Sequence, residues 1–273
     1  MQFIIPIVSI IIILFLLYLS AIAGRRNAKG LKKLQGFFYA HRGLHRKPAI
    51  PENSLSAFRR AAAKGYGAEL DIHLLRDGGL AVFHDSELKR TTGADGIIED
   101  LTTEELKNYT LEASDECIPC FTEVLDIFED TAPLIIELKT YKGNAKALCE
   151  AAFKILDSYK GAYCVESFDP RCLIWLKKNR PDVIRGQLSQ NYFKHKSSGL
   201  GAVVDFILTN LLSNFLTRPD FIAYRFSDRK NLSNVICTKL LGIQAVSWTI
   251  KSKADHDTAT REGCLSIFER FEP

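Results

Sequence analysis

Residues 68–74, with the sequence AELDIHL, are typical of a buried β-strand. Side chains alternate between the two faces of a strand, so Glu69 and Asp71 share one face and apolar residues occupy the other. Amphipathic or charged stretches that predict helices separate many further apolar runs, at 37–40, 80–83, 134–138, 162–168, 184–188, 221–224 and 244–249. Eight buried strands with intervening helices predict an α/β fold, most economically closed as a (β/α)₈ barrel, the TIM-barrel architecture.

Charged side chains gather where several of these runs end. The set comprises two histidines, three acids, an arginine and a lysine, namely His41, Arg42, Glu69, Asp71, His84, Glu137 and Lys139. A solvated strand end is the ordinary explanation of any one of them, but it does not explain the whole set. In a barrel the ends of the strands lie around one rim, where the active sites of such enzymes are built. The sequence therefore predicts a functional site at this rim.

The residue types of this set indicate phosphoryl chemistry. The three carboxylates are hard oxygen ligands and suit Ca²⁺ or Mg²⁺ better than Zn²⁺. The arginine and the lysine have the charge and the donors to hold phosphoryl oxygens. The two histidines exchange protons near neutral pH, one as a base and one as an acid. Together they predict phosphodiester cleavage without an obligatory protein nucleophile.

At these residues the sequence resembles the glycerophosphodiester phosphodiesterases. The similarity extends from about residue 37 to the C-terminus and remains in register throughout. The linked set of HRG, E-x-D, HD and E-x-K is specific, whereas HRG alone would not be. The segments that carry the resemblance are AHRG (40–43), PENS (51–54), AELDIHLLRDG (68–78), VFHD (82–85), IPCFTEVL (118–125), IIELK (135–139) and VSWTI (246–250).

The resemblance implies a (β/α)₈ barrel that needs a divalent cation, Ca²⁺ or Mg²⁺, and splits glycerophosphodiesters into glycerol 3-phosphate and an alcohol. Motif by motif, it makes His41 and His84 the acid/base pair. It makes Glu69, Asp71 and Glu137 the metal ligands. It assigns phosphate binding and organisation of the site to Arg42, Glu52 and Lys139. Trp248 is either barrel packing or an apolar wall for glycerol.

Because of two departures from the family pattern, the identity of the alcohol that the reaction releases is not determined. The family usually has asparagine after the W-T-I motif, and here Lys251 stands in that place. The last segment, GCLSIFERFEP, matches the closing strand of the family only loosely. Both features border the far side of the site, so they bear on the identity of the alcohol and not on the reaction.

The first segment is built differently, because no charged residue occurs from Phe3 to Ala23. As a helix at about 1.5 Å per residue, these residues would reach roughly 31 Å, long enough to cross a bilayer core. A cleaved signal peptide is one alternative, suggested by the A-x-A pattern before Gly24, but no cation precedes the apolar run. A buried core helix is the other. We expect a membrane anchor at 1–24, a basic juxtamembrane linker at 25–36 and the catalytic barrel at 37–273.

Charge indicates the orientation of this anchor. Five cations follow the apolar run within nine residues, and the first acidic residue of the chain is Glu52. By the positive-inside rule, they predict a single-pass cell-membrane protein with a cytoplasmic catalytic domain. Seven cysteines, an odd number, also suit a reducing compartment. Outside the cationic cluster the chain is close to neutral despite its formal net charge of +4, so we expect no nucleic-acid partner.

A second apolar segment runs from Leu200 to Leu216, with Val204, Leu208 and Leu212 at helical spacing. It is either a helix packed on the barrel or an interfacial helix that touches the membrane near lipid-like substrates. Three functions therefore remain in view. Hydrolysis of glycerophosphodiesters is preferred, and a lysophospholipase D-type reaction on lysophospholipids is the alternative enzyme. A non-catalytic, membrane-tethered barrel that binds phosphoglycerol groups is disfavoured, because such a module needs no pair of proton-transfer groups.

Overall fold

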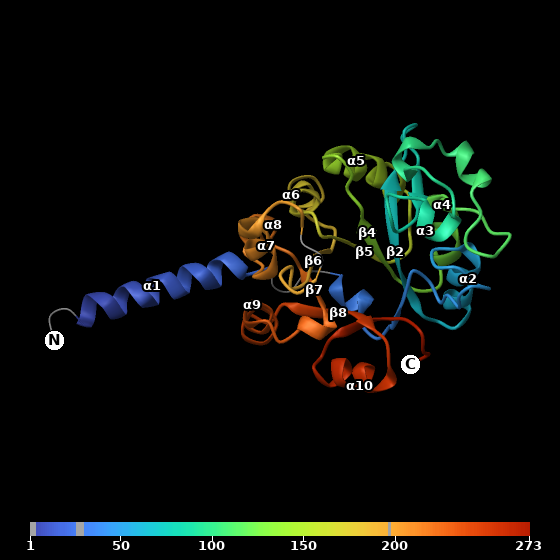
Figure 1. Cartoon of the computed structure of the whole chain (residues 1–273). Coiled ribbons are helices and arrows are strands. Elements are labelled where there is room, and N and C mark those ends of the chain that lie inside the picture. The colour runs from blue at the N-terminus through green and yellow to red at the C-terminus, as the bar shows by residue number, and fades with distance from the viewer. Residues whose placement is uncertain (1–3, 26–29, 196–197) are drawn as a thin grey trace.

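Eight parallel strands close into a barrel in the computed structural model, which describes residues 4–25, 30–195 and 198–273 (Figure 1). Each strand pairs with its neighbours in parallel register, and β1 closes the ring by pairing with both β2 and β9. The prediction of a (β/α)₈ barrel is confirmed. The barrel strands are β1 (Tyr39–His41), β2 (Gly67–Leu74), β4 (Leu134–Leu138), β5 (Tyr163–Ser167), β6 (Arg185–Ser189), β7 (Phe221–Arg225), β8 (Gln244–Ile250) and β9 (Leu265–Phe268).

One of the eight predicted barrel strands is wrong. The run at 80–83 forms β3 (Leu80–Val82), which pairs antiparallel with the outer end of β2 and stands outside the barrel. The eighth barrel strand is β9, from the segment that matches the family loosely. The apolar run at 80–83 has the same pattern as a barrel strand. It pairs antiparallel with β2 instead, because one turn at residues 75–79 folds the chain back on that strand.

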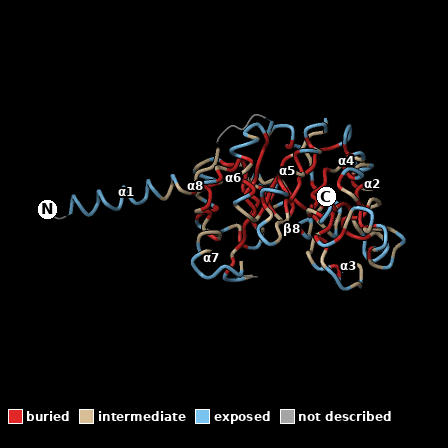
Figure 2. Tube along the Cα trace, turned by 90° about the horizontal axis from the view of Figure 1, so that it is seen from above, coloured by how far each residue is buried: buried red, intermediate tan, exposed pale blue. Residues whose placement is uncertain are grey.

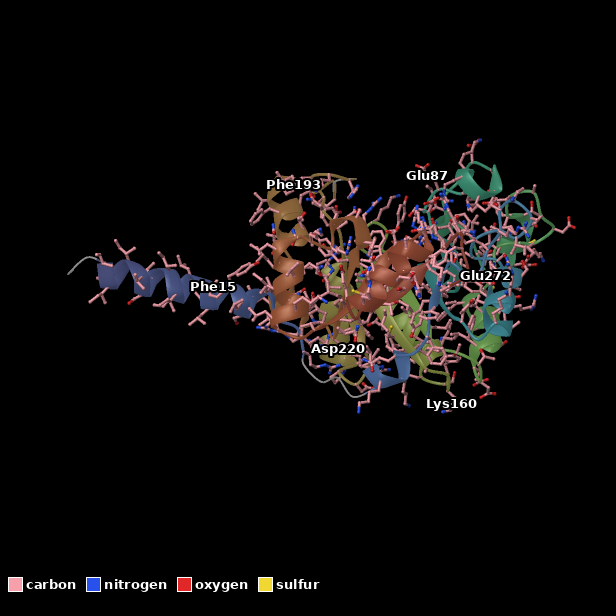
Figure 3. All side chains as sticks on the ribbon, turned by 90° about the horizontal axis from the view of Figure 1, so that it is seen from below. Phe15, Glu87, Lys160, Phe193, Asp220 and Glu272 are labelled. Atoms are coloured by element: carbon pink, nitrogen blue, oxygen red, sulfur yellow. The ribbon has the colours of Figure 1, made fainter. Side chains whose placement is uncertain are left out.

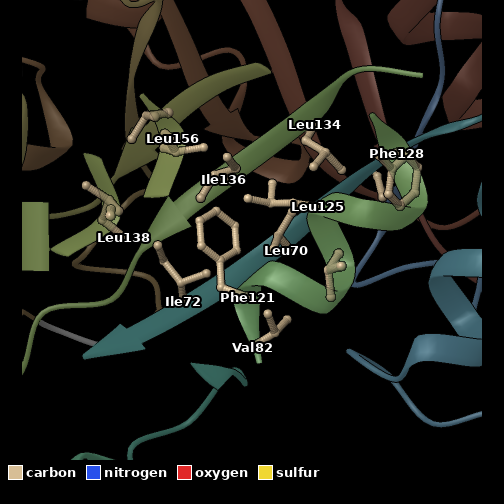
Figure 4. Close-up of a cluster of buried hydrophobic side chains, with 14 of the residues drawn as sticks. Leu70, Ile72, Val82, Phe121, Leu125, Phe128, Leu134, Ile136, Leu138 and Leu156 are labelled. Carbon is tan, nitrogen blue, oxygen red and sulfur yellow. The ribbon is translucent and has the colours of Figure 1, made fainter. Parts of the chain in front are cut away.

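Alternation along the strands separates two layers of side chains. Leu70 and Ile72 of β2 and Ile136 of β4 point outward and pack against the covering helices (Figure 4). The intervening positions point into the barrel, where Ile135 belongs to a second apolar cluster that fills the interior. Glu69, Asp71 and Glu137 share this inward alternation, so the strand pattern itself places carboxylates inside the rim.

Helices cover the outside of the barrel. Ser54 caps α2 by accepting a hydrogen bond from Ala57 N at 3.2 Å, and Asp169 caps α6 with Pro170 in its first turn. The covering helices are α2 (Leu55–Ala63), α4 (Phe121–Phe128), α5 (Ala145–Leu156), α6 (Pro170–Asn179), α7 (Ala202–Thr209), α8 (Asn214–Thr217), α9 (Leu232–Val235) with η5 (Ile236–Leu240), and α10 (Lys253–Arg261).

Short elements between β3 and α4 form a small unit beside the rim. Phe83, Leu88, Ile98 and Leu106 pack together there as a separate buried cluster. This cluster fixes the backbone on which His84 stands, although that residue lies on no barrel strand. The elements are α3 (Lys89–Thr92), η2 (Ile98–Asp100) and η3 (Glu104–Asn108); η1 (Leu31–Leu34) precedes β1 and η4 (Phe226–Asp228) follows β7.

The N-terminal apolar segment is one long helix, α1 (Ile4–Ile22), which projects away from the barrel (Figure 1). By length and composition it is able to cross a membrane, and it is exposed over almost its whole length (Figure 2). Its last turn differs, because Ile22 is fully buried. That side chain packs into a cluster with Leu211, Ile222, Tyr224, Cys237 and Ile243.

The end of α1 is also tied to the barrel by hydrogen bonds. Asn214 Nδ2 donates to the carbonyl oxygen of Ile22 at 2.8 Å, and Arg218 Nη1 donates to those of Ser20 and Ala23 at 2.7 and 3.0 Å. The last carbonyls of a helix lack intrahelical partners, so these side chains act as its C-terminal cap. Within the predicted linker at 25–36, residues 26–29 lie outside the described part of the chain.

The segment from Leu200 to Leu216 does not form the single helix that its spacing predicts. It contains α7 and α8, separated by a turn in which Leu211 has a φ of 57°. The turn also changes which side chains face solvent. Leu208 and Leu212 are partly buried, whereas Val203 and Phe206 are 74% and 54% exposed.

Candidate active site

The HRG motif forms the turn that leaves β1. His41 is the last residue of the strand, and Arg42 has a φ of 54°. Gly43 also has a positive φ, and a Cβ there would lie 2.9 Å from the backbone carbonyl carbon of Ala57. Only glycine fits this approach to α2 without displacing it. The turn directs the backbone N–H of Arg42 to Glu69 Oε2 at 3.1 Å.

The three predicted metal ligands converge inside the rim. Glu69, Asp71 and Glu137 are all buried, and one ligand oxygen from each lies within 4.8 Å of the other two. Burial, followed by repulsion from the other two carboxylates, raises the pKa of Glu69 well above its usual range. Burial likewise raises the pKa of Glu137 to about 7. A divalent cation among these oxygens would relieve both penalties, so the donor set fits Ca²⁺ or Mg²⁺.

Two cationic side chains, Arg42 and Lys139, border the carboxylates. Lys139 Nζ lies 3.0 Å from Asp71 Oδ1 and 2.8 Å from Glu137 Oε1. Arg42 donates from Nη1 to Glu52 Oε1 at 2.7 Å, and its Nε lies 3.5 Å from Asp71 Oδ2. Glu52 thus orients Arg42, and the guanidinium remains at the mouth of the site.

His84 reaches the site from the small unit outside the barrel. Phe83 N donates to the carbonyl oxygen of Asp71 at 3.0 Å, which brings the next residue beside the carboxylates. His84 Nδ1 lies 2.6 Å from Asp85 Oδ1. His73 does not approach the carboxylates, since its ring lies between Glu99 at 2.6 Å and the carbonyl oxygen of His84 at 3.2 Å. It therefore supports the backbone of His84.

His41 is held by a residue that the sequence reasoning missed. Its Nδ1 lies 2.8 Å from Oε2 of Glu269, the residue that follows β9. Burial and the nearby Arg42 lower the pKa of His41 to about 4, although Glu269 opposes that shift. Lys251, where the family has asparagine, contacts Glu269 at 3.1 Å. No sequence motif marked Glu269, because its role depends on the pairing of β9 with β1.

Two more polar residues belong to the site. Asn53, the third residue of the PENS motif, donates from Nδ2 to Asp71 Oδ2 at 3.0 Å. Glu166 on β5 stands beside Glu137 in the parallel register, and its burial raises its pKa well above the usual range. The inward alternation of the 162–168 run was a signal for Glu166 that the sequence reasoning did not use.

Trp248 packs inside the barrel and also lines a cavity. Its indole Nε1 donates to the carbonyl oxygen of Ala223 at 3.0 Å, which fixes the ring against β7. The ring also packs edge-on against Phe168, with centroids 5.5 Å apart, and both residues line a cavity of about 50 Å³. Six of the predicted site residues also line this cavity: His41, Arg42, Glu69, His84, Glu137 and Lys139.

The chain is similar to known proteins in both sequence and structure. A sequence profile described as the glycerophosphoryl diester phosphodiesterase family matches residues 41–268. The chain belongs to this family. Members share the barrel, as the solved structures show. An Oleispira antarctica phosphodiesterase, solved with the product sn-glycerol-3-phosphate, superimposes with a TM-score of 0.72 at 22% identity, over 90% of this chain and 95% of its own.

Curated relatives carry the same family name. A glycerophosphodiester phosphodiesterase of Caldanaerobacter subterraneus is 34% identical over 55% of this chain and 65% of its own length. The match to a Bacillus altitudinis relative is 39% identical over 37% of this chain and 43% of that relative, so the chain spans less than two thirds of both proteins. The Bacillus subtilis enzyme matches at 26% identity over 85% of this chain and 82% of its own.

Proposed function

We propose that this protein hydrolyses glycerophosphodiesters to glycerol 3-phosphate and an alcohol. The observation that carries the proposal is the convergence of His41, His84, Glu69 and Glu137 on one small cavity, with Asp71 completing the carboxylate triad beside them. Membership of the family supports it, as does the glycerol 3-phosphate bound to the Oleispira antarctica relative. The reaction needs a proton removed from water and a proton delivered to the alcohol oxygen, and the two histidines divide these tasks.

The carboxylate triad would hold one divalent cation, Ca²⁺ or Mg²⁺. When bound, the ion supplies a Lewis acid that withdraws charge from a phosphoryl oxygen. Formal charges favour this arrangement. Three carboxylates, a dication, a phosphodiester anion and the cations of Arg42 and Lys139 sum to zero. Arg42 and Lys139 hold the remaining phosphoryl oxygens and stabilise the charge that develops on them.

Replacing each histidine separately tests the reaction. His41→Ala and His84→Ala should each lower kcat for glycerophosphoglycerol by about 10²–10⁴-fold. The midpoint of thermal unfolding should hardly change, because neither ring lies in the apolar core. Release of glycerol 3-phosphate by the full-length protein is the measurement. Turnover near that of the wild type in either variant would contradict the acid/base assignment, and a wild type inactive with either metal would contradict the proposed reaction.

The cavity favours water-soluble diesters over lysophospholipids. A volume of about 50 Å³ bounded by Trp248, Phe168, Leu188 and Ile267 suits the glycerol arm and leaves little room for an acyl chain on it. Lysophospholipase D-type cleavage remains the second candidate, because α1 would place the enzyme beside lipid. A comparison of glycerophosphoglycerol with a lysophospholipid distinguishes the two. A barrel that only binds phosphoglycerol groups would cleave neither.

We also propose that α1 is a retained, single-pass anchor with the barrel on the cytoplasmic side. Its apolar length and the cations that follow it support this orientation. The burial of Ile22 supports retention, because cleavage before Gly24 would remove a side chain from the cluster on β7. The protein should stay in membranes after a high-salt wash, and external protease should leave the barrel whole. A mature form that begins at Gly24 would overturn the anchor.

A second membrane contact surrounds the base of α1. Outside α1, most of the exposed large apolar side chains of the described residues lie on the segments beside the base of that helix. Phe193 marks this side of the domain in Figure 3. We call this the apolar collar: Phe193, Leu200, Val203, Phe206, Phe215, Leu216, Leu232, Val235 and Leu240. Because α1 ends against α8, the collar would lie at the bilayer surface that α1 enters.

A further inference from the structure

Two of the cavities at the rim meet at His41 and Arg42. The small cavity beside Trp248 shares His41 and Arg42 with a larger cleft of about 970 Å³. A phosphoryl group held at Arg42 therefore has one ester arm in each space. The glycerol arm is the same in every glycerophosphodiester, and it matches the small cavity. The large cleft has room for the arm that differs between substrates, which is the leaving alcohol.

The large cleft is strongly cationic. Among the described residues that line it, seven are lysine or arginine and three are glutamate. The seven cations are Arg42, Arg46, Lys47, Arg60, Arg90, Lys251 and Arg270. Such a lining is unusual for this chain, because outside the N-terminal cations its acidic and basic residues nearly balance. A cleft lined by one sign of charge concentrates ligands of the opposite sign.

The carboxylates of the cleft are already paired. Glu52 contacts Arg42, Lys47 and Arg90, and Glu269 contacts His41, Lys251 and Arg270. Glu272 pairs with Arg60 and with Lys64, which lies outside the lining. Two carboxylates from outside, Glu112 and Asp85, contact Lys47 and Arg90. Positive charge remains in excess after these pairs are counted.

The exposed positions of the cleft determine what a bound group meets first. Arg46 is exposed, and the side chain of Arg270 is 69% exposed. Phe271 is the aromatic residue among the described lining residues. A quaternary ammonium group is normally bound by several aromatic faces. In this cleft the cations would repel choline, and one phenylalanine ring would offer little attraction to offset that repulsion. An anionic group would form charge-assisted hydrogen bonds with the guanidinium groups.

We propose that this cleft binds the leaving alcohol and selects alcohols that carry a further phosphate group. The inference rests on the proposed hydrolysis and names its substrate class. Arg46 and Arg270 are the specificity residues, and neither touches the reacting phosphoryl group. The cleft lies toward Glu272, on the side of the domain away from the base of α1 (Figure 3), so it opens to solvent and not to the membrane.

Competition between substrates tests the proposal with the full-length protein in detergent and Mg²⁺ or Ca²⁺. The substrates are glycerophosphoinositol 4-phosphate, glycerophosphoglycerol and glycerophosphocholine, whose alcohols are anionic, uncharged and cationic. We expect kcat/KM to fall in that order. In Arg46→Gln/Arg270→Gln the ratio of kcat/KM for the phosphorylated to the uncharged substrate should fall about tenfold. Arg46→Gln alone, which leaves the contact of Arg270 with Glu269 intact, should lower that ratio in part.

Lys146→Gln is the matched control, since Lys146 is 78% exposed on α5 and should leave the ratio unchanged. A lysolipid with the same phosphorylated head group separates a lipid source from a soluble one, and we expect the soluble diester to be preferred. Equal cleavage of glycerophosphocholine, or a ratio that the arginine variants do not change, would overturn the proposal.

A binding measurement separates this inference from the proposed reaction. Calorimetric titration with inositol 4-phosphate should show tighter binding to the wild type than to Arg46→Gln/Arg270→Gln, whether or not any diester is cleaved. Equal affinity for both proteins would overturn the cleft assignment by itself. Absence of hydrolysis of glycerophosphoglycerol with intact inositol 4-phosphate binding would instead overturn the reaction and leave the cleft as an anion site.

Discussion

His41 Nδ1 lies 2.8 Å from Glu269 Oε2, and this contact joins the first strand of the barrel to the residue that follows its last strand. Both side chains are largely buried, with 14% and 11% of their surfaces exposed. A carboxylate on Nδ1 fixes the tautomer and the ring plane, so the opposite nitrogen, Nε2, faces the carboxylate triad, 3.9 Å from Glu69 Oε2. Glu269 is thus a positioning residue for His41.

Glu269→Gln should lower kcat on the order of 10²-fold and change KM little, because the imidazole loses its anionic partner but the phosphate ligands stay in place. Steady-state kinetics with glycerophosphoglycerol measure both constants. Glu262→Gln is the matched control, since Glu262 follows α10 and is ion-paired with Arg229. An unchanged kcat in Glu269→Gln would show that His41 needs no such partner.

Removing the metal should abolish activity and lower the thermal unfolding midpoint together. Three buried carboxylates repel one another without a dication, and a ligand that binds the folded state stabilises it. Exhaustive chelation followed by Ca²⁺ or Mg²⁺ should restore both properties. Glu69→Gln and Asp71→Asn should weaken Mg²⁺ or Ca²⁺ affinity in calorimetry much more than they weaken folding. Full activity after chelation would exclude the metal site.

Ile22→Ala should destabilise the barrel by about 2–4 kcal/mol, because the side chain is fully buried against β7. Ile12→Ala is the matched control, since Ile12 is 51% exposed on the same helix and contacts no part of the barrel cluster. Denaturant unfolding of both variants in detergent measures the difference. Equal stabilities would show that α1 is only a tether and would reopen the signal-peptide alternative.

The apolar collar should contact lipid at the positions that the structure exposes. A tryptophan introduced by Phe206→Trp should be quenched by brominated lipids in nanodiscs, because Phe206 is 54% exposed beside α1. Lys146→Trp on α5 should add no quenched component above the background of the native tryptophans. Leu208→Ser and Leu212→Ser should instead lower stability, since both side chains are partly buried. Equal quenching at residues 206 and 146 would refute the collar.

The sequence predicts the barrel and most of its site because one periodicity serves both. Alternation that turns Leu70 and Ile72 outward must turn Glu69 and Asp71 inward, so the fold and the carboxylates follow from the same run. Local patterns also locate His41 and Arg42, because a turn that requires Gly43 follows β1 directly.

The errors arise where partners are distant in sequence. A short apolar run does not reveal whether its pairing is parallel or antiparallel, so the prediction counted β3 as a barrel strand and did not include β9. Helical spacing from Leu200 to Leu216 does not show the turn at Leu211. The spacing therefore does not predict which side chains of the segment face solvent. Glu269 had no local signal, since its function depends on a residue 228 positions earlier.

The closure of the ring by β1 and β9 has a consequence for biosynthesis. Tyr39 and Ala40 pair with Ile267 and Phe268, so a contact of very high sequence separation completes the barrel. While the chain is being translated, β1 has no neighbour on that side until residues 265–268 leave the ribosome. The proposed anchor, α1, precedes the barrel in the chain and would reach the bilayer while the nascent barrel is still an open sheet. His41 and Glu269 would meet only at closure, so the proposed site would form after membrane insertion.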